Sequence, residues 1–428
     1  MKSYRDCWRK LDNTAKIFSL SVTDEMSVFR LSAVLKKDIK EDILFKAVVR
    51  ALHDYPEYRV RLGNGVFWSY LEFNDKAPIV EEENDIPCTN INLRKNNDYL
   101  FKVTYFNNKI NLDIYHVLTD GTGAIFFFRD IIYHYLSLIY KMKSVFVSEE
   151  EINSIDQYLN YYDSNYKNKK SSKKAFIIPG KANMNINNTY HYTVSIKEIK
   201  SVCKGYKVTI TEFITAIYIY SLYLSYYKKS NKDIIVSVPI NLRKYYEDET
   251  LSNFFTYMNI DGNINGMENV SFEDILVNVK KEFLNKLNSE KVKEYLSRDM
   301  KLGNNLSIRL VPLFIKKLFI KYLGKLVNSS ATTRLSNIGI VDISDEYKKY
   351  IDNIYVLVSP NKVQKIKCTI CSYGDNLNIS INSNVNDKKF EDVFYKELNN
   401  YVKKINVESN KKTNKRKGRL NVSNKNKK

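Results

Sequence analysis

The sequence predicts a mixed α/β or α+β protein made of two fused halves. At 428 residues the chain is too long for one ordinary core, and its 44% hydrophobic residues are enough for two. Segments with the alternation of strands are interspersed with segments of helical periodicity. Residues 166–174 (YKNKKSSKK) are polar and basic, as is typical of a linker. We therefore place the halves at 1–165 and 181–405, a crossover linker at 166–180, and a basic disordered tail at 406–428.

The first half begins with short elements of both kinds. Apolar residues at helical spacing predict a helix over 41–55, which Pro56 ends. The turn Asn107-Asn108 predicts a hairpin that joins the strand before it to the strand after it. The other expected elements are a strand at 27–33, an aromatic strand at 66–73, an acidic loop at 81–85 and a strand at 99–105.

Residues 109–136 (KINLDIYHVLTDGTGAIFFFRDIIYHYL) join a strand to a helix. Ile110, Leu112, Ile114 and His116 alternate with polar residues and share one face of the strand. After a turn with two glycines, apolar residues recur at helical spacing. The pattern places a histidine on the buried face at a strand end, which is a sheltered position for a proton-transfer group.

The second half repeats the mixture of strands and helices. The segment 211–227 has no polar stripe, so we expect a helix that is buried on most sides. Residues 376–382 (NLNISIN) alternate cleanly, which predicts a strand in a sheet exposed on one face. The remaining expected strands are 190–195, 233–239, 253–260, 332–343, 353–359 and 365–371, and the remaining helices are 195–206, three within 272–327, and 390–401.

Cysteine content and hydropathy indicate a cytoplasmic protein. The five cysteines are few and odd in number, which favours free thiols in a reducing compartment: Cys7, Cys88, Cys203, Cys368 and Cys371. The N-terminus is charged and has no apolar signal-peptide core, and no run reaches the length of a transmembrane segment.

The net charge of +20 is unevenly distributed. The segment from Lys411 to the end holds nine basic residues and no acid, so it supplies +9 and the remainder +11. Polyanion binding through this tail is one hypothesis, and a solubilising appendage is the other. The many Tyr and Phe lie in periodic segments rather than in basic patches, so we expect core packing and no specific nucleic-acid partner.

Several familiar sites are absent from the sequence. Cys368 and Cys371 form a C-x-x-C, but strand alternation places them on opposite faces, so we expect no metal site and interpret them as core and surface thiols. The glycine-rich patterns that bind nucleotide phosphates are missing, and so is the G-x-S-x-G turn of serine hydrolases.

What remains is H-x-x-x-D-G, formed by His116, Asp120 and Gly121. By itself it also fits a core histidine beside a turn whose aspartate caps a helix. Its spacing resembles the signature of the chloramphenicol acetyltransferase-like superfamily of CoA-dependent acyltransferases, which includes condensation domains, plant BAHD enzymes and alcohol acetyltransferases. Three further segments are similar to bacterial alcohol-acetyltransferase-like proteins: 8–18 (WRKLDNTAKIF), 239–255 (PINLRKYYEDETLSNFF) and 335–339 (LSNIG).

The resemblance implies two α+β halves with mixed sheets and an active-site tunnel between them. His116 would be the general base. Asp120 would point away from substrate and pair with an arginine, for which Arg243 is the candidate, and Gly121 would let the backbone turn tightly. The candidates for the tunnel wall and for donors to an oxyanion are Asn241, Asn253, Ser336 and Asn337.

The same resemblance implies acyl-CoA as co-substrate, no bound cofactor, and a small alcohol or amine as acceptor, in a monomer. A carrier-protein thioester is the alternative donor. Tyr115 stands where condensation domains carry a second histidine, and the D-F-G-W-G motif of BAHD enzymes is absent. Both departures favour the alcohol-acetyltransferase-like branch. A non-catalytic protein that kept the fold is the competing hypothesis.

Overall fold

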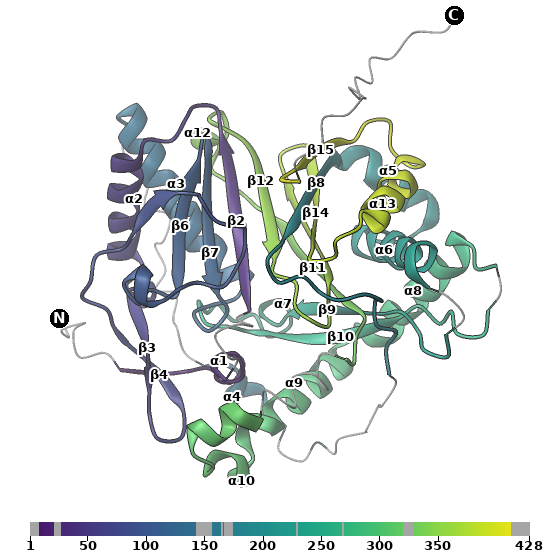
Figure 1. Cartoon of the computed structure of the whole chain (residues 1–428), viewed down its shortest axis with the longest axis horizontal. Coiled ribbons are helices and arrows are strands. Elements are labelled where there is room, and N and C mark those ends of the chain that lie inside the picture. The colour runs from purple at the N-terminus through teal and green to yellow at the C-terminus, as the bar shows by residue number, and fades with distance from the viewer. Residues whose placement is uncertain are drawn as a thin grey trace, which may run out of the picture.

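The computed structural model describes residues 8–20, 27–142, 156–163, 166, 174–227, 230–267, 269–319 and 329–411. Two lobes stand side by side, each with a sheet whose outer face is covered by helices (Figure 1). The sheets turn toward each other in the middle of the molecule. The predicted mixed α/β class with two halves is confirmed.

The first lobe is built on a five-stranded sheet. Its order is β12-β2-β7-β6-β5, and neighbours are antiparallel except β5 and β6. The strands are β2 (Val28–Leu35), β5 (Val80–Glu82), β6 (Phe101–Phe106), β7 (Lys109–Tyr115) and β12 (Ile351–Val358). Strand β12 lies within the predicted second half (181–405) but pairs with β2, so a segment of that half completes the sheet of the first lobe.

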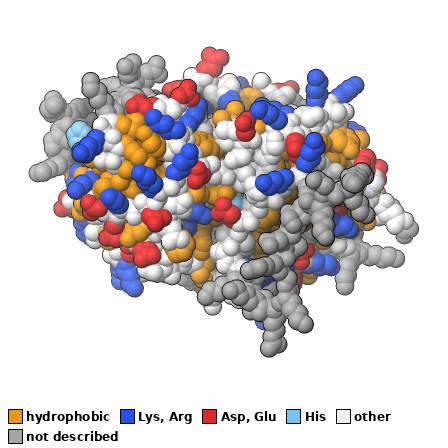
Figure 2. All heavy atoms as spheres, turned by 90° about the horizontal axis from the view of Figure 1, so that it is seen from above, with side chains coloured by type: hydrophobic (Ala, Val, Ile, Leu, Met, Phe, Trp, Pro, Cys, Tyr) orange, Lys and Arg blue, Asp and Glu red, His pale blue; other side chains and the backbone are white. Residues whose placement is uncertain are grey.

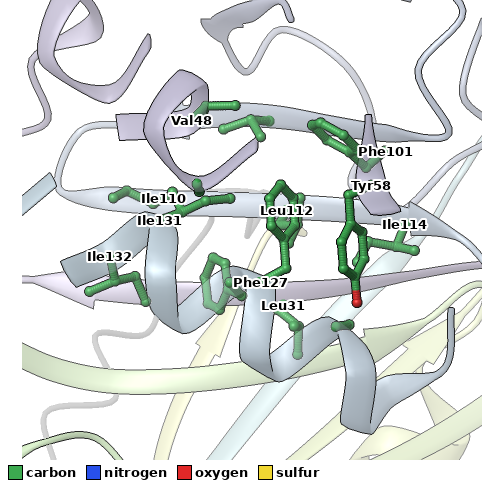
Figure 3. Close-up of a cluster of buried hydrophobic side chains, with 14 of the residues drawn as sticks. Leu31, Val48, Tyr58, Phe101, Ile110, Leu112, Ile114, Phe127, Ile131 and Ile132 are labelled. Atoms are coloured by element: carbon green, nitrogen blue, oxygen red, sulfur yellow. The ribbon is translucent and has the colours of Figure 1, made fainter. Parts of the chain in front are cut away.

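Two long helices cover this sheet, α2 (Glu41–Asp54) and α3 (Gly121–Tyr140). Figure 3 shows how Phe127 and Ile131 of α3 lie against Leu112 and Leu31 of the sheet. The apolar spacing read from the sequence is thus the packing face of the helix. The smaller elements are β1 (Arg9–Lys10), β3 (Val60–Asn64) and β4 (Ser69–Phe73) in a separate sheet, α1 (Asn13–Ser19), α4 (Tyr158–Tyr161), α12 (Asp345–Lys348), and the 3-10 turns η3 (Pro56–Tyr58) and η4 (Arg94–Asn96).

The second lobe contains a seven-stranded sheet of order β10-β9-β11-β13-β14-β8-β15. Strand β11 is parallel to both neighbours, and the other pairs are antiparallel. The strands are β8 (Asn188–Ser195), β9 (Ile235–Asn241), β10 (Phe255–Asp261), β11 (Thr333–Ile340), β13 (Ile366–Tyr373), β14 (Asn376–Ser383) and β15 (Asn406–Ser409). The helices are α5 (Ile196–Tyr206), α6 (Ile210–Tyr226), α7 (Arg243–Tyr246), α8 (Phe272–Lys286), α9 (Ser289–Asn304), α10 (Leu306–Arg309) and α13 (Lys389–Asn399).

Helix α6 is the core helix of the second lobe. Most of its apolar side chains are buried, as the missing polar stripe predicts, whereas Leu224 is exposed. Thr209 begins it through a capping box with Glu212, which satisfies backbone N–H groups of the first turn. Among the helices that the structure describes, none is by itself long and apolar enough to cross a membrane; α5 and α6 reach that length and composition only as a pair bent by 86°.

The polar face of β14 is buried, contrary to the expectation of a one-sided sheet. Asn378, Ser380 and Asn382 are at most 1% exposed. Asn378 Nδ2 donates to Asn353 Oδ1 at 2.6 Å and to the Ile354 carbonyl at 2.8 Å, both in β12. The alternation is correct, but the second face meets the other lobe through hydrogen bonds instead of meeting solvent.

Two further expectations are corrected by the structure. Cys368 and Cys371 do face opposite sides, but both are buried, in the cores of the second and first lobe respectively. Cys371 is therefore not a surface thiol. Residues 406–409, expected in the disordered tail, form β15 and pair with β8. Residues 412–428 of the predicted tail and 167–173 of the predicted linker lie outside the described residues.

The surface carries charges of both signs. On the face shown in Figure 2, Lys and Arg side chains of the described residues are interspersed with Asp, Glu and apolar side chains. This pattern is that of an ordinary solvated surface rather than a continuous basic track. The described residues on this face therefore do not favour polyanion binding.

Candidate active site

His116 follows directly after β7, where its backbone N–H donates to the Ser27 carbonyl at 2.9 Å. Its imidazole packs between the rings of Phe18 and Phe29, with centroids at 4.8 and 4.6 Å. Phe255, the first residue of β10 in the other lobe, lies at 5.7 Å. The histidine therefore stands where the two lobes meet.

This apolar surrounding lowers the pKa of His116 to about 4, with burial as the main cause. The carboxylate of Asp120 opposes the shift, and the cations of Arg334 and Lys367 add to it. The imidazole is consequently neutral near pH 7. A neutral imidazole has one ring nitrogen that can accept a proton.

Asn253 determines which ring nitrogen that is. Its Nδ2 donates to Asp12 Oδ2 and to the His116 carbonyl, both at 3.0 Å. These two bonds fix the orientation of the amide, so its Oδ1 faces His116 Nδ1, at 3.4 Å. Because an amide oxygen only accepts hydrogen bonds, Nδ1 carries the proton. The lone pair is left on Nε2.

Asp120 is a structural residue in this arrangement. One carboxylate oxygen accepts from the backbone N–H groups of Thr122 and Gly123, both at 3.1 Å, and so caps α3. The other accepts from Arg243 Nη1 at 2.8 Å and from the Phe254 N–H at 2.9 Å. These contacts join the start of α3 to the second lobe and leave the carboxylate facing protein groups.

Arg243 lies beside Asp120, and its guanidinium spans the loop that leads to Asn253. It donates to the Thr250 carbonyl from Nε (3.1 Å) and Nη2 (2.7 Å), and to the Ser252 carbonyl from Nη2 at 2.7 Å. The pair therefore holds both the helix that follows His116 and the residue that orients its ring. The structure thus brings His116, Asp120, Arg243 and Asn253 together.

The surrounding atoms leave no space for a side chain at Gly123, whereas they do not require glycine at position 121. A Cβ at Gly121 would meet only the flexible tip of Ile338, and its φ is not positive. A Cβ at Gly123 would overlap the Thr119 hydroxyl and come within 2.6 Å of the Leu251 carbonyl. Gly121 is the first residue of α3 and makes no tight turn of its own. The role predicted for Gly121 thus needs correction.

Gly123→Ala is expected to destabilise the protein by about 1–3 kcal/mol, because the new methyl group collides with backbone that cannot move freely. Urea unfolding followed by circular dichroism measures the change. Gly121→Ala is the matched control, and we expect it to lie within about 1 kcal/mol of wild type. Equal stabilities for the two variants would contradict the assignment.

The four oxyanion candidates differ in their freedom to donate. Both amide hydrogens of Asn253 are used, and Asn241 donates to Thr122 Oγ1 at 3.1 Å. Asn337 is exposed and donates to Thr211 Oγ1 at 2.8 Å. The Ser336 hydroxyl makes no hydrogen bond within the described parts of the chain. Ser336 is therefore the candidate whose donor is wholly uncommitted, whereas Asn241 and Asn337 each keep one further amide hydrogen and Asn253 keeps none.

Some residues near the site were not predicted. Asp12 lies in the segment 8–18 that carried the resemblance, but nothing local marked it as the partner of Asn253. Lys367 is the one charged residue in the strand Ile366–Tyr373, which was a usable signal. Arg334 becomes notable only because β11 pairs with β13 and aligns it with Lys367.

A second cluster of possible metal ligands lies away from His116, between α2 and α3. The side-chain ligand atoms of Asp54, Asp130 and His134 are within 4.8 Å of one another. His134 Nε2 is 2.6 Å from Asp54 Oδ2 and 3.4 Å from Asp130 Oδ2. Burial opposes protonation, but the two carboxylates outweigh it and raise the pKa of His134. The raised pKa favours the imidazolium, which would pair with both carboxylates, so an ion pair between the helices accounts for the cluster.

No family model and no curated protein matches the sequence. Solved structures match over nearly the whole chain. TRI3 trichothecene 15-O-acetyltransferase from Fusarium sporotrichioides is 14% identical at a TM-score of 0.59, covering 92% of this chain and 94% of its own. F. graminearum TRI101, complexed with coenzyme A and deoxynivalenol, is 10% identical at a TM-score of 0.65, covering 94% and 99%. The protein has the chloramphenicol acetyltransferase-like fold.

Solved structures of proteins other than acetyltransferases also match this chain. The epimerization domain from the third module of tyrocidine synthetase B is 9% identical at a TM-score of 0.58, covering 94% of this chain and 98% of its own. Condensation domains match as well. The predicted chloramphenicol acetyltransferase-like fold is thus confirmed, and the function must be argued from the residues.

Proposed function

We propose that this protein is an acyltransferase that moves an acyl group from acyl-CoA to the hydroxyl or amine of a small acceptor, with His116 as general base. The observation that carries the proposal is the imidazole at the junction of the lobes. Asn253 faces Nδ1, and Nε2 keeps its lone pair. On an unrelated fold, a histidine in such surroundings would be interpreted as a core residue. Here it is the histidine of the H-x-x-x-D-G pattern on a fold shared with acetyltransferases, which supports a role in acyl transfer.

In the proposed reaction, His116 Nε2 takes the proton of the acceptor hydroxyl as its oxygen attacks the thioester carbonyl. A carbon–oxygen bond forms and the carbonyl electrons move to the oxyanion. The intermediate then collapses, the carbon–sulfur bond breaks, and the thiolate takes the proton from the imidazolium. The histidine returns to its neutral form, so the cycle needs no other acid or base.

The remaining candidate residues have supporting roles. Ser336 would donate its free hydroxyl to the oxyanion, where charge develops in the transition state. Asp120 and Arg243 would be positioning residues, because they hold the start of α3 and the loop before Asn253. Asn253 would maintain the productive tautomer of His116.

The proposal is tested by following thiol release from acetyl-CoA with a panel of alcohols and amines. Acceptor-dependent release, with formation of the acetylated product, supports it. An acetylated carrier protein in place of acetyl-CoA distinguishes the alternative donor. If neither donor is consumed but acetyl-CoA binds, the competing hypothesis of a non-catalytic protein is favoured.

The low pKa of His116 predicts an acid-tolerant enzyme. Because the base must be neutral and its pKa is about 4, kcat/KM should stay level down to roughly pH 5 and fall below that. A pH profile of kcat/KM in a constant-ionic-strength buffer measures this. A midpoint near 6.5, the ordinary value of histidine, would show that His116 is solvated in the working enzyme.

A further inference from the structure

Two cationic side chains lie next to each other on the wall that faces His116. Arg334 of β11 and Lys367 of β13 are direct partners in the parallel pairing of these strands. Their neighbours Leu335 and Cys368 point into the core of the second lobe. Because side chains alternate along a strand, Arg334 and Lys367 point the opposite way, toward the first lobe. Both are close enough to His116 to lower its pKa.

Neither cation has an acidic partner among the described residues. Lys367 is only 7% exposed and is in no ion pair. The Arg334 guanidinium lies over the Tyr257 ring at 4.3 Å, and its buried Nε has no hydrogen-bond acceptor. Burial of an uncompensated charge is costly, and burial, with Arg334 adding, lowers the pKa of Lys367 to about 7.

The acids in the neighbourhood are already paired with other groups. Asp120 binds Arg243, and Asp113 binds Arg30. The Cys88 thiol also faces Lys367, but burial raises the pKa of Cys88, so the thiol stays neutral. Asp12, which is also near His116, accepts from Asn253. The protein thus places two basic side chains beside the proposed general base, and no acid among the described residues forms an ion pair with either of them.

We propose that Arg334 and Lys367 bind an anionic group, a carboxylate or a phosphate, on the acceptor, so that the acceptor is an anionic alcohol or amine. The inference rests on the proposed function, because it assumes that His116 is the reacting base. The phosphates of CoA fit less well. The whole pantetheine arm separates them from the thioester, whereas the two cations act on the histidine that the acceptor must reach.

Binding can be tested without any turnover. The full-length protein with 13C-labelled histidine is titrated by NMR with acetate, with inorganic phosphate, and with acetamide as neutral control. Either anion, bound between the two cations, should raise the pKa of His116, and acetamide should not. The effect should vanish in the double variant Arg334→Gln/Lys367→Met. It should persist in Lys46→Met, which removes an exposed lysine of α2.

The outcomes separate the inference from the proposed function. A shift that is equal in the double variant and in wild type would mean general screening by salt and would overturn the inference, as would no shift with either anion. A shift only with acetate or only with phosphate supports it and identifies the anion. These results hold whether or not the protein transfers an acyl group.

Measurements of kcat/KM provide a second test of the inference. Lactate and glycerol 3-phosphate are compared with lactamide and glycerol as acceptors of the acetyl group. The double variant should lose on the order of 10- to 100-fold in kcat/KM for the anionic acceptors and little for the neutral ones. Equal use of neutral and anionic acceptors by the wild type would overturn the inference while leaving the acyltransferase proposal intact.

Discussion

His116→Ala is expected to lower kcat for acyl transfer by about 100- to 10,000-fold, the usual contribution of a general base. The reason is that His116 Nε2, with its lone pair at the junction of the lobes, would take the proton of the acceptor in the proposed reaction. Thiol release from acetyl-CoA at saturating acceptor measures the effect. Activity that stays at the wild-type level would refute the mechanism.

Controls are needed because His116 also packs among aromatic rings. His116→Gln keeps much of the side-chain volume and should lose activity as severely, with a stability closer to wild type. His53→Gln changes an exposed histidine at the end of α2 and should leave kcat unaltered. Binding of acetyl-CoA by both His116 variants, measured by calorimetry, shows that the site is still folded.

Arg243→Met is expected to destabilise the protein by about 3–5 kcal/mol, because it leaves the buried carboxylate of Asp120 without its cation. The carbonyls of Thr250 and Ser252 also lose their donors. Urea unfolding monitored by circular dichroism gives the change. We expect kcat to fall as well, since the loop to Asn253 is no longer held.

A double-mutant cycle shows whether the loss belongs to the ion pair. Asp120→Asn removes the charge and keeps the cap on α3, so the double variant with Arg243→Met should be less damaged than the sum of the two single changes. Arg61→Met is the comparison, because its pair with Glu72 is partly exposed and should contribute less than about 1 kcal/mol. Additive effects at Asp120 and Arg243 would argue against their coupling.

The sequence by itself determined the elements that depend on local pattern. Alternation in 109–115 gave β7, helical spacing gave the packing face of α3, and the aspartate at 120 marked the start of that helix. The position of His116 at the strand end follows from these three facts. Each involves residues within one or two turns of one another, where side-chain direction is set by backbone geometry alone.

Only the tertiary structure decided what surrounds the histidine. Asn253 and Asp12 are 241 residues apart in the chain, and they meet because α1 and the start of β10 are brought to the same junction. Lys367 and Arg334 share a face because β11 is placed parallel to β13. The order of strands and the docking of two lobes are set by the summed packing of both cores, which no local pattern encodes. The candidate base could therefore be identified from the sequence, whereas the residues that orient its ring and the two basic side chains that face it could not.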